Sequence, residues 1–530
     1  MLFNSFGFVY IYLPIAVLGF FWAARVSHRA AALWVVAASL FFYSWWNPKF
    51  VSLLLFSIAL NFCSSLAIAR ARSAARNPRT ASRLLILAIA MNLSLLGYFK
   101  YANFFLAAVA TVGGYAIPPA EIVLPLGISF FTFTQLAYLV DVSRGLARDY
   151  DFIHYILFVS YFPHLIAGPI LHHAQIIPQF AAPGTYRADY RNIAAGLTIF
   201  VLGLAKKVLL ADALGPYANA VFDAARDGAQ PTLVDSWIGA AAYGLQLYFD
   251  FSGYCDMAIG LSLIFNVRLP LNFDSPYKAA SIIDFWRRWH MTLSSFLRDY
   301  LYIPLGGNRK GARRRYVNLF VTMVLGGLWH GAGWTFVFWG ALHGAYLLIN
   351  HAFRAMKARI IFRPNEILVK CASVGTTFLA VTVAWVFFRA DSFPAAWAIV
   401  KGMVGANGIS LPVSLSGPLS QVTGTGIVVS GIMPLVKERG ENPVQVCAMI
   451  ALCLFIVWFL PNVRQVMKTY RPTWQDIAAP EIEAERSDQY FPAGWLTWRP
   501  SLPVAVGLAS LLFVSIVYMT RTSTFLYFQF

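Results

Sequence analysis

Charged residues are scarce in this chain. Only 12% of its 530 residues are Asp, Glu, Lys or Arg, whereas an ordinary soluble domain has about 25%. Hydrophobic residues make up 59%, and the mean hydropathy is +0.62. Apolar runs close to the roughly 20 residues that cross a bilayer recur along the whole length. This composition excludes an ordinary soluble domain and predicts an all-α, polytopic integral membrane protein with roughly 10–13 membrane segments.

Sequence motifs of several common chemistries are absent. The chain has no G-x-x-x-x-G-K-[ST] phosphate loop, no H-E-x-x-H zinc helix and no G-x-S-x-G nucleophile elbow. Nucleotide hydrolysis, zinc proteolysis and serine-hydrolase chemistry are therefore not supported. The cysteines form no C-x-x-C pair, so neither a disulfide framework nor a metal site is predicted. We interpret all five as small buried hydrophobic residues: Cys63, Cys255, Cys371, Cys447 and Cys453.

The excess of basic residues is explained by membrane topology. There are 41 Lys and Arg against 23 Asp and Glu, but the basic residues concentrate in short loops between apolar runs, so nucleic-acid binding is not indicated. Five arginines between 70 and 83 predict a cytoplasmic loop and, counted back over three crossings, an external N-terminus. No charged residue precedes Arg25, so the run 7–24 is expected to remain as a membrane helix rather than a cleaved signal.

The apolar runs define candidate helices at 7–24, 30–46, 50–69, 84–112, 121–140, 152–170, 192–211, 233–265, 316–350, 369–388, 445–460 and 502–519. Between about 150 and 300 the alternation blurs, because Lys206, Lys207, Asp250 and Asp256 lie inside apolar runs. Half-helices or re-entrant segments are expected there. The stretch 405–444, which is rich in Gly, Ser and Pro, is predicted to be an external loop. We treat 1–530 as one polytopic domain; a family resemblance, given below, implies that 121–350 is its catalytic core.

The segment 316–350 is apolar but has basic residues on both sides, so both of its ends are expected in the cytoplasm. A hairpin or re-entrant pair satisfies this, and the glycine-rich string 326–333 is its natural break. About thirteen helical residues at 1.5 Å each would place His330 about 20 Å deep. A neutral imidazole there could act as a general base. The alternative is a structural histidine; the neighbouring glycines, which would leave room for a substrate, favour the functional interpretation.

A second histidine, His290, ends the run DFWRRWH at 284–290. On a helix, Asp284 and Arg288 stand at i and i+4 and can pair, while Trp286 and Arg287 would share a face with His290. We interpret this strip as a basic cytoplasmic mouth that receives an anionic donor. The alternative is an interfacial amphipathic helix with tryptophan anchors.

The acidic residues of the run 246–256 allow two interpretations. Asp250 and Tyr254 share one helical face with Gln246. They could orient a histidine or pair with an arginine, either Arg287 or Arg288. For Asp250 and Asp256, structural pairing is the favoured role.

Several motifs, in order, resemble one known family. They are LPLGISFFTF at 124–133, FPHLIAGP at 162–169, DFSGYCD at 250–256, DFWRRWH at 284–290, RDYLYIPLGGN at 298–308 and GGLWHGAGW at 326–334. Together these resemble bacterial membrane-bound O-acyltransferases over roughly residues 1–400. The terminal FLYFQF at 525–530 and the overall length look most like the alginate O-acetylase branch.

The resemblance implies a fold with a central funnel and an acyl transfer from a cytoplasmic thioester, acetyl-CoA or a carrier protein, toward a hydroxyl acceptor. It also implies a multi-pass location in the bacterial inner membrane and periplasmic acetyltransferase partners that modify an exopolysaccharide. His330 matches the family's principal catalytic histidine and His290 its second functional histidine. A donor-binding or supporting role is expected for these residues: Arg287, Arg288, Asp250, Asp256, Trp329 and Asn308.

Other functions remain open at the level of sequence. Within the enzyme class, the polymer could be cellulose or peptidoglycan rather than alginate, or the reaction could be D-alanyl transfer to teichoic acid. Outside it, the chain could be a transporter, with Asp250, Asp256 and Lys206 as relay groups, or a scaffold that assembles periplasmic transferases.

Overall fold

The computed structural model describes residues 1–73, 78–115, 118–147, 151–357, 365–410, 427–428, 433–438, 440–478, 497–520 and 525–526. Three sets of residues from the predictions above lie outside these ranges: residues 74–77 of the arginine-rich loop, most of 405–444, and 527–530 of the terminal motif.

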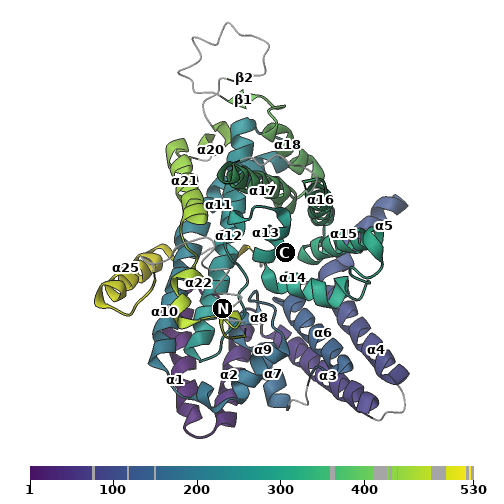
Figure 1. Cartoon of the computed structure of the whole chain (residues 1–530), viewed down its shortest axis with the longest axis vertical. Helices are drawn as coiled ribbons and strands as arrows, with labels where there is room; N and C mark the ends of the chain where they lie inside the picture. Colours follow the sequence, from purple (N-terminus) through teal and green to yellow (C-terminus); the bar gives the residue numbers. More distant parts are fainter. Residues whose placement is uncertain are drawn as a thin grey trace.

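The N-terminal part of the chain forms a group of helices that lies mostly at the lower end of the molecule in Figure 1, while α5 lies higher, beside α15 (Gly311–His330). This part of the chain begins with the π-helical turn η1 and continues through nine α-helices and a second π-helical turn. The bounds are η1 Gly7–Tyr12, α1 Leu13–Ala24, α2 His28–Ser44, α3 Lys49–Ser73, α4 Pro78–Leu96, η2 Gly97–Tyr101, α5 Ala102–Gly113, α6 Ile128–Arg144, α7 Phe152–Ser160, α8 Phe162–Leu165 and α9 His173–Ala181.

The long helix α12, Leu233–Ile264, forms the axis of the molecule and spans about 48 Å. Three neighbours pack along it: α10 (Tyr190–Ala205), η4 (Lys206–Ala211) and α11 (Asp212–Arg226). One end of α12 belongs to an apolar cluster shared with α1, α2 and α6–α10, and the other to a cluster shared with α11, α17 and α18. α12 therefore joins two hydrophobic cores.

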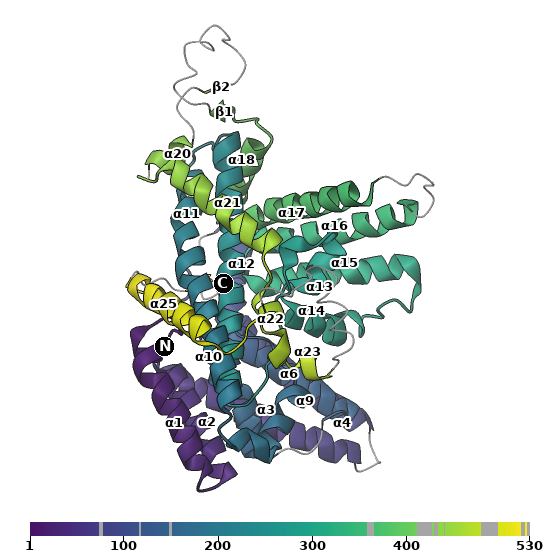
Figure 2. The same ribbon diagram turned by 60° about the vertical axis from the view of Figure 1, so that its left-hand side comes forward.

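A helical hairpin projects from this axis. α15, Gly311–His330, packs closely against α16, Trp334–Lys357, and α17, Glu366–Arg389, packs against α16. Figure 2 shows the three helices lying one above another beside α12. Between the axis and the hairpin run η5 Pro276–Lys278, α13 Ile282–Arg288, α14 Met291–Leu297 and η6 Arg298–Tyr302.

The remaining elements, apart from η3, follow α17 in the sequence. They are α18 Phe393–Met403, β1 Ile409–Ser410, β2 Ile427–Val428, α20 Pro434–Glu438, α21 Pro443–Phe459, α22 Val463–Val466, η8 Lys468–Tyr470, α23 Gln475–Ala478 and α25 Leu502–Tyr518; η3, Pro183–Tyr186, follows α9. β1 and β2 pair in parallel. Leu526 brings the chain back to the core, where its N–H donates to the Asp250 carboxylate over 3.0 Å.

Most predicted helices and the hairpin are confirmed, with several differences. The run 121–140 is helical only from Ile128, where α6 begins, and the helix predicted to end at 211 continues through α11 to Arg226. The run 152–170 is not one helix, because α7 ends at Ser160 and α8 is a separate turn that begins beyond Tyr161. The predicted loop 405–444 contains β1, β2 and α20. Three of the five cysteines, Cys63, Cys371 and Cys447, are exposed rather than buried.

Among the described residues, five helical stretches are long and apolar enough to cross a membrane: Gly7–Ala24, Lys49–Ser73, Arg79–Gly113, Tyr190–Arg226 and Glu366–Arg389. α21 and α25 are shorter apolar helices. The chain is a multi-pass membrane protein.

Candidate active site

His330 is the last residue of α15, at the break of the hairpin, and only 5% of it is exposed. Its ring lies 4.9 Å from the indole of Trp329, 5.2 Å from Trp339 and 5.2 Å from Phe388, measured between ring centroids. Trp329 belongs to the first apolar cluster, while Trp339 and Phe388 belong to the second. His330 therefore lies where the two hydrophobic cores meet.

His290 lies beside His330, with ring centroids 6.3 Å apart, and it is fully buried. It does not continue the predicted helix, since α13 ends at Arg288 and His290 has a left-handed backbone with φ +46°. The prediction that His290 shares a helical face with Trp286 and Arg287 is therefore wrong. A left-handed backbone is uncommon for a residue with a side chain. Here it lets the chain turn between α13 and α14.

Asn272 sets the tautomer of His290. Its Oδ1 accepts from the Thr292 N–H over 3.2 Å and the Thr292 hydroxyl over 2.9 Å, which identifies Oδ1 as an acceptor. The Nδ1 of His290 lies 3.1 Å from the same oxygen, so Nδ1 carries the proton and donates it. In the neutral ring, Nε2 is then the basic nitrogen. Sequence reasoning missed Asn272, because an Asn in a loop carries no pattern that points to a histidine eighteen residues later.

Lys100 and Tyr101, from η2, cap the end of α15 that carries His330. The Lys100 ammonium donates to the carbonyl oxygens of Trp329 and His330 over 2.6 and 3.0 Å, and the Tyr101 hydroxyl donates to the Leu328 carbonyl over 2.9 Å. The last carbonyls of a helix have no partner within the helix. These two side chains therefore fix the backbone that carries His330. Sequence reasoning missed Lys100, although a lone lysine in the apolar run 84–112 is itself a signal.

Three glycines near His330, namely Gly327, Gly331 and Gly340, stand where a side chain has no space. A Cβ at Gly327 would lie 2.3 Å from the Phe336 carbonyl oxygen, and one at Gly340 would lie 2.4 Å from the Met323 carbonyl oxygen. A Cβ at Gly331 would meet the Phe336 ring at 2.3 Å. The expectation that the glycine string opens a substrate pocket is therefore wrong for Gly327 and Gly331, whereas a Cβ at Gly326 or Gly333 would meet only side-chain atoms, at 3.2 Å or more. The absent side chains of Gly327 and Gly340 let α15 and α16 touch through their backbones.

The acidic residues of α12 pair with lysines of η4. Asp250 lies 2.6 Å from the Lys207 ammonium, and Asp256 lies 2.6 Å from Lys206. Structural pairing is thus confirmed, but the partners suggested from sequence, Arg287 and Arg288, are wrong. A buried charge is stable only when it is paired, and these pairs join α12 to η4.

The predicted pairing within α13 is confirmed, and it separates the two arginines. The Arg288 guanidinium donates to Asp284 over 2.9 Å, whereas Arg287 lines a cavity of about 360 Å³. That cavity is lined by several basic residues and by apolar and hydroxyl side chains of α14 and α15. Its lining includes Trp286, Arg287, Leu297, Arg298, Asn308, Arg315, Thr322, Met323 and His351.

The cavity is related to His330 through α15, which lines the cavity and ends at His330. Met323 precedes His330 by seven residues of α15, which corresponds to about 10 Å along the helix. The cavity thus combines a basic side, with Arg287, Arg298 and Arg315, and an inner wall on the helix that carries His330. The predicted supporting residues Arg287 and Asn308 line it together, and Arg288, Asp250 and Asp256 do not appear among its lining residues.

Two of the sequence motifs pack against each other and against the hairpin. Gly127 begins α6 with φ +73°, and a Cβ there would lie 2.8 Å from the Leu165 carbonyl oxygen, so 124–133 and 162–169 meet through their backbones. Phe133 stacks on the Trp329 indole with ring centroids 5.1 Å apart. The motifs therefore support the helix end at which His330 stands.

In this multi-helix membrane protein, two buried imidazoles lie side by side at a capped helix end, and the same helix lines a basic cavity. The chain belongs to the membrane-bound O-acyltransferase family, whose model matches residues 40–390. It is an acyltransferase.

Named relatives share most of its length. The chain is 44% identical to a peptidoglycan O-acetyltransferase of Helicobacter pylori, over 78% of this chain and 81% of the relative. It is 42% identical to a probable alginate O-acetylase of Azotobacter vinelandii, over 76% and 78% respectively. A teichoic acid D-alanyltransferase of Bacillus subtilis is 25% identical over 52% of this chain and 71% of the relative.

Proposed function

We propose that this O-acyltransferase takes an acetyl group from a cytoplasmic thioester and passes it across the inner membrane for O-acetylation of an exopolysaccharide, alginate in the first instance. Acetyl-CoA or an acetylated carrier protein is the donor. Periplasmic acetyltransferases are the partners that complete the transfer. The observation that carries the proposal is the pair of adjacent buried imidazoles, His330 and His290, together with a basic cavity whose lining includes Met323, seven residues before His330 on α15.

The basic cavity suits the donor. A thioester donor carries phosphate groups, and Arg287, Arg298 and Arg315 offer charge-assisted hydrogen bonds to them. The inner wall, with Leu297 and Met323, is apolar enough for the thioester arm. Donor phosphates held at the arginines would direct the acetyl group along α15 toward His330.

In the reaction, His330 accepts the proton of the attacking hydroxyl as its oxygen bonds to the thioester carbonyl carbon. The tetrahedral intermediate then collapses, the carbon–sulfur bond breaks, and the leaving thiolate takes the proton from the His330 imidazolium, which returns the ring to its neutral form. His290 supports this step: its Nδ1 proton is held by Asn272, which presents the basic Nε2 on the other side of the ring.

The test is replacement of His330 by Ala in cells whose own copy is deleted. We expect acetylation of the exported polymer to be lost while the protein remains in the membrane at the wild-type level. The matched control is His28→Ala, which removes an exposed imidazole at the start of α2. Retained acetylation in His330→Ala would remove this residue from the mechanism.

Peptidoglycan is the second candidate acceptor, because the Helicobacter pylori relative bears that name and is as similar as the alginate relatives. The two are separated by measuring ester-linked acetate in purified alginate and in purified peptidoglycan from the deletion strain. Loss of ester-linked acetate from peptidoglycan alone would show that peptidoglycan, and not alginate, is the acceptor.

A further inference from the structure

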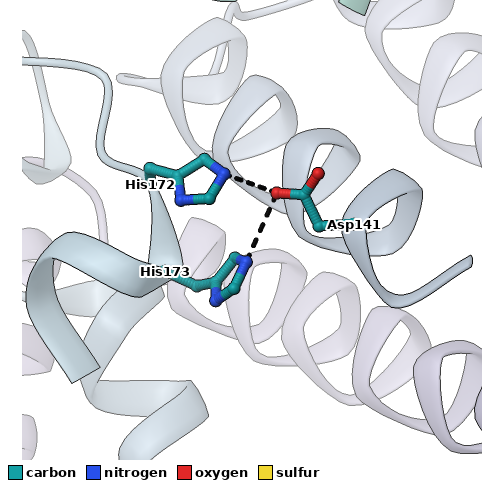
Figure 3. A group of neighbouring side chains, drawn as sticks. All are labelled: Asp141, His172 and His173. Carbon is teal, nitrogen blue, oxygen red and sulfur yellow. Dashed lines mark ion pairs between the residues drawn. The ribbon is translucent and has the colours of Figure 1, made fainter. Parts of the chain in front are cut away.

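A second cluster of ionisable side chains lies apart from the residues of the reaction. Asp141, in the last turn of α6, points toward His172, which caps α9, and His173, its first residue (Figure 3). The Nε2 atoms of the two imidazoles lie 2.5 and 3.3 Å from the same carboxylate oxygen, Oδ2. All three ligand atoms lie within 4.8 Å of one another.

This carboxylate oxygen is unusually crowded. The hydroxyl of Tyr300, from η6, also reaches Oδ2 of Asp141, over 2.8 Å. One carboxylate oxygen offers about two lone pairs, yet three polar atoms converge on it. A cation between the carboxylate and the two ring nitrogens would resolve the crowding, because both imidazoles would then act as ligands rather than as competing donors. Two imidazoles and one carboxylate are a ligand set that zinc and similar divalent transition metals prefer.

Burial and access also fit a metal ion. The side chains of Asp141 and His173 are 2% and 1% exposed, so the negative charge is placed where it needs a compensating cation. His172 is 35% exposed and, with Tyr300, lines a cavity of about 340 Å³. An ion could enter from that side, and further coordination positions would face the cavity. Zinc sites with three protein ligands keep such an open position.

One contact opposes this assignment, and it is weak. The Ala174 N–H donates to Nδ1 of His172 over 3.4 Å, which would place the proton of that ring on Nε2. This distance lies beyond the usual range for such a bond. The start of α9 keeps its other cap, in which Gln175 Oε1 accepts from the His172 N–H over 3.1 Å. If His172 gave up its long contact with the Ala174 N–H in order to bind a metal ion, the stability of α9 would therefore change little.

We propose that Asp141, His172 and His173 bind one divalent transition-metal ion, with zinc the best match. The ion ties α6 to α9 in the wall of the 340 Å³ cavity. This site is independent of the acyl acceptor and of His330, and it departs from the sequence-based expectation that the chain holds no metal.

The test is the metal content of the full chain, purified in detergent through a tag without histidines and washed with a mild chelator. We expect about one zinc ion per chain in the wild type and in His154→Ala, and a loss of most of it in the double variant His172→Ala/His173→Ala. His154 is the matched control, because it also pairs with an aspartate, Asp151, over 2.7 Å.

A second measurement applies even where the double variant does not fold. Wild-type protein stripped with a strong chelator should regain thermal stability as zinc is added, and Tm should rise with zinc concentration. Absence of zinc from the washed wild type, together with no rise in Tm, would overturn the proposal. Zinc retained by the double variant would also overturn the proposal, because that zinc would be an adventitious ion only.

Discussion

At the scale of single residues, the site depends on polar groups that hold two imidazoles in an apolar surrounding. Asn272 fixes the proton of His290, and Lys100 fixes the backbone of His330. Neither partner belongs to a histidine motif, and Lys100 is also 230 residues away from His330 in the sequence. The chemistry of the site therefore rests on residues that are not themselves part of the two histidine motifs.

Replacement of Lys100 by Met tests the cap on α15. Two carbonyls at the end of the helix would lose an ammonium donor, and a hydrogen bond to a charged group contributes about 1.5–3 kcal/mol. We expect acyl transfer to fall about 10- to 100-fold, measured as the initial rate of release of free thiol from the donor by protein in lipid nanodiscs.

Two further substitutions, each at a lysine, complete this test. Lys100→Arg keeps the charge and the donors and should recover part of the rate, which a purely steric role would not explain. Lys49→Met removes an exposed lysine at the start of α3 and should leave the rate unchanged. An unaltered rate in Lys100→Met would show that the cap has no part in positioning His330.

The histidines could be singled out as candidates because membrane insertion penalises ionisable groups, and the structure shows that both are buried. The same criterion would have identified Lys100. Asn272 was not predictable, since the contact that gives it a role joins a loop to a histidine with a left-handed backbone. Backbone conformations of this kind depend on the packing of several elements and leave no periodicity in the sequence.

At the scale of elements, the hairpin is the part that sequence defined best. Basic residues on both sides of one apolar segment require a return, and the glycine string marked its position. The role of the glycines was misjudged, because periodicity does not distinguish a glycine that leaves space from one whose space a neighbouring backbone fills. Gly327 and Gly340 are of the second kind.

Gly327→Ala should separate α15 from α16. The added methyl group would overlap the Phe336 carbonyl oxygen, and an overpacked core costs about 1–3 kcal/mol. We expect a lower Tm by intrinsic tryptophan fluorescence and a reduced rate of acyl transfer, since the shift moves His330 relative to His290.

The matched control for this variant is Gly375→Ala in α17, where an added Cβ meets nothing within 4 Å. Alanine is the better helix former, so that variant should be at least as stable as the wild type. Equal Tm values for Gly327→Ala and the wild type would show that the close approach of the two helices is not required.

At the scale of the whole molecule, the site lies where two hydrophobic cores meet beside the long helix α12. Composition predicted a multi-pass helical protein, and the motifs predicted its family, which the family match confirms. The sequence could not show that α12 serves both cores. That depends on which faces of one continuous apolar helix meet which neighbours, and an apolar helix with little amphipathic pattern does not reveal this.

The basic cavity makes a prediction at this scale. Arg287→Ala and Arg315→Ala should each raise KM for the thioester donor about tenfold or more, with a smaller change in kcat, because charge-assisted contacts to phosphates bind substrate and transition state alike. The KM of the wild type should also rise with ionic strength. Steady-state kinetics with acetyl-CoA and with an acetylated carrier protein would measure this for both donors.

Arg226→Ala is the control, since it removes the same charge from an exposed position on α11. A fall in kcat with an unchanged KM in the two cavity variants would place these arginines outside donor binding.

The π-helical turns have a consequence for how this chain tolerates change in length. Lys100 lies in η2, and Lys206 and Lys207 lie in η4, so three lysines that bind helix carbonyls or carboxylates stand where the helix has more residues per turn than an α-helix. Such a turn accommodates one residue more than an α-helix of the same length, so deleting one residue from it would let it relax to an ordinary α-helix and leave the flanking helices in place. The lysine would then lose the turn that directs it to its carboxylate or carbonyl. In this protein, single-residue deletions in these two turns are thus mutations of charge placement.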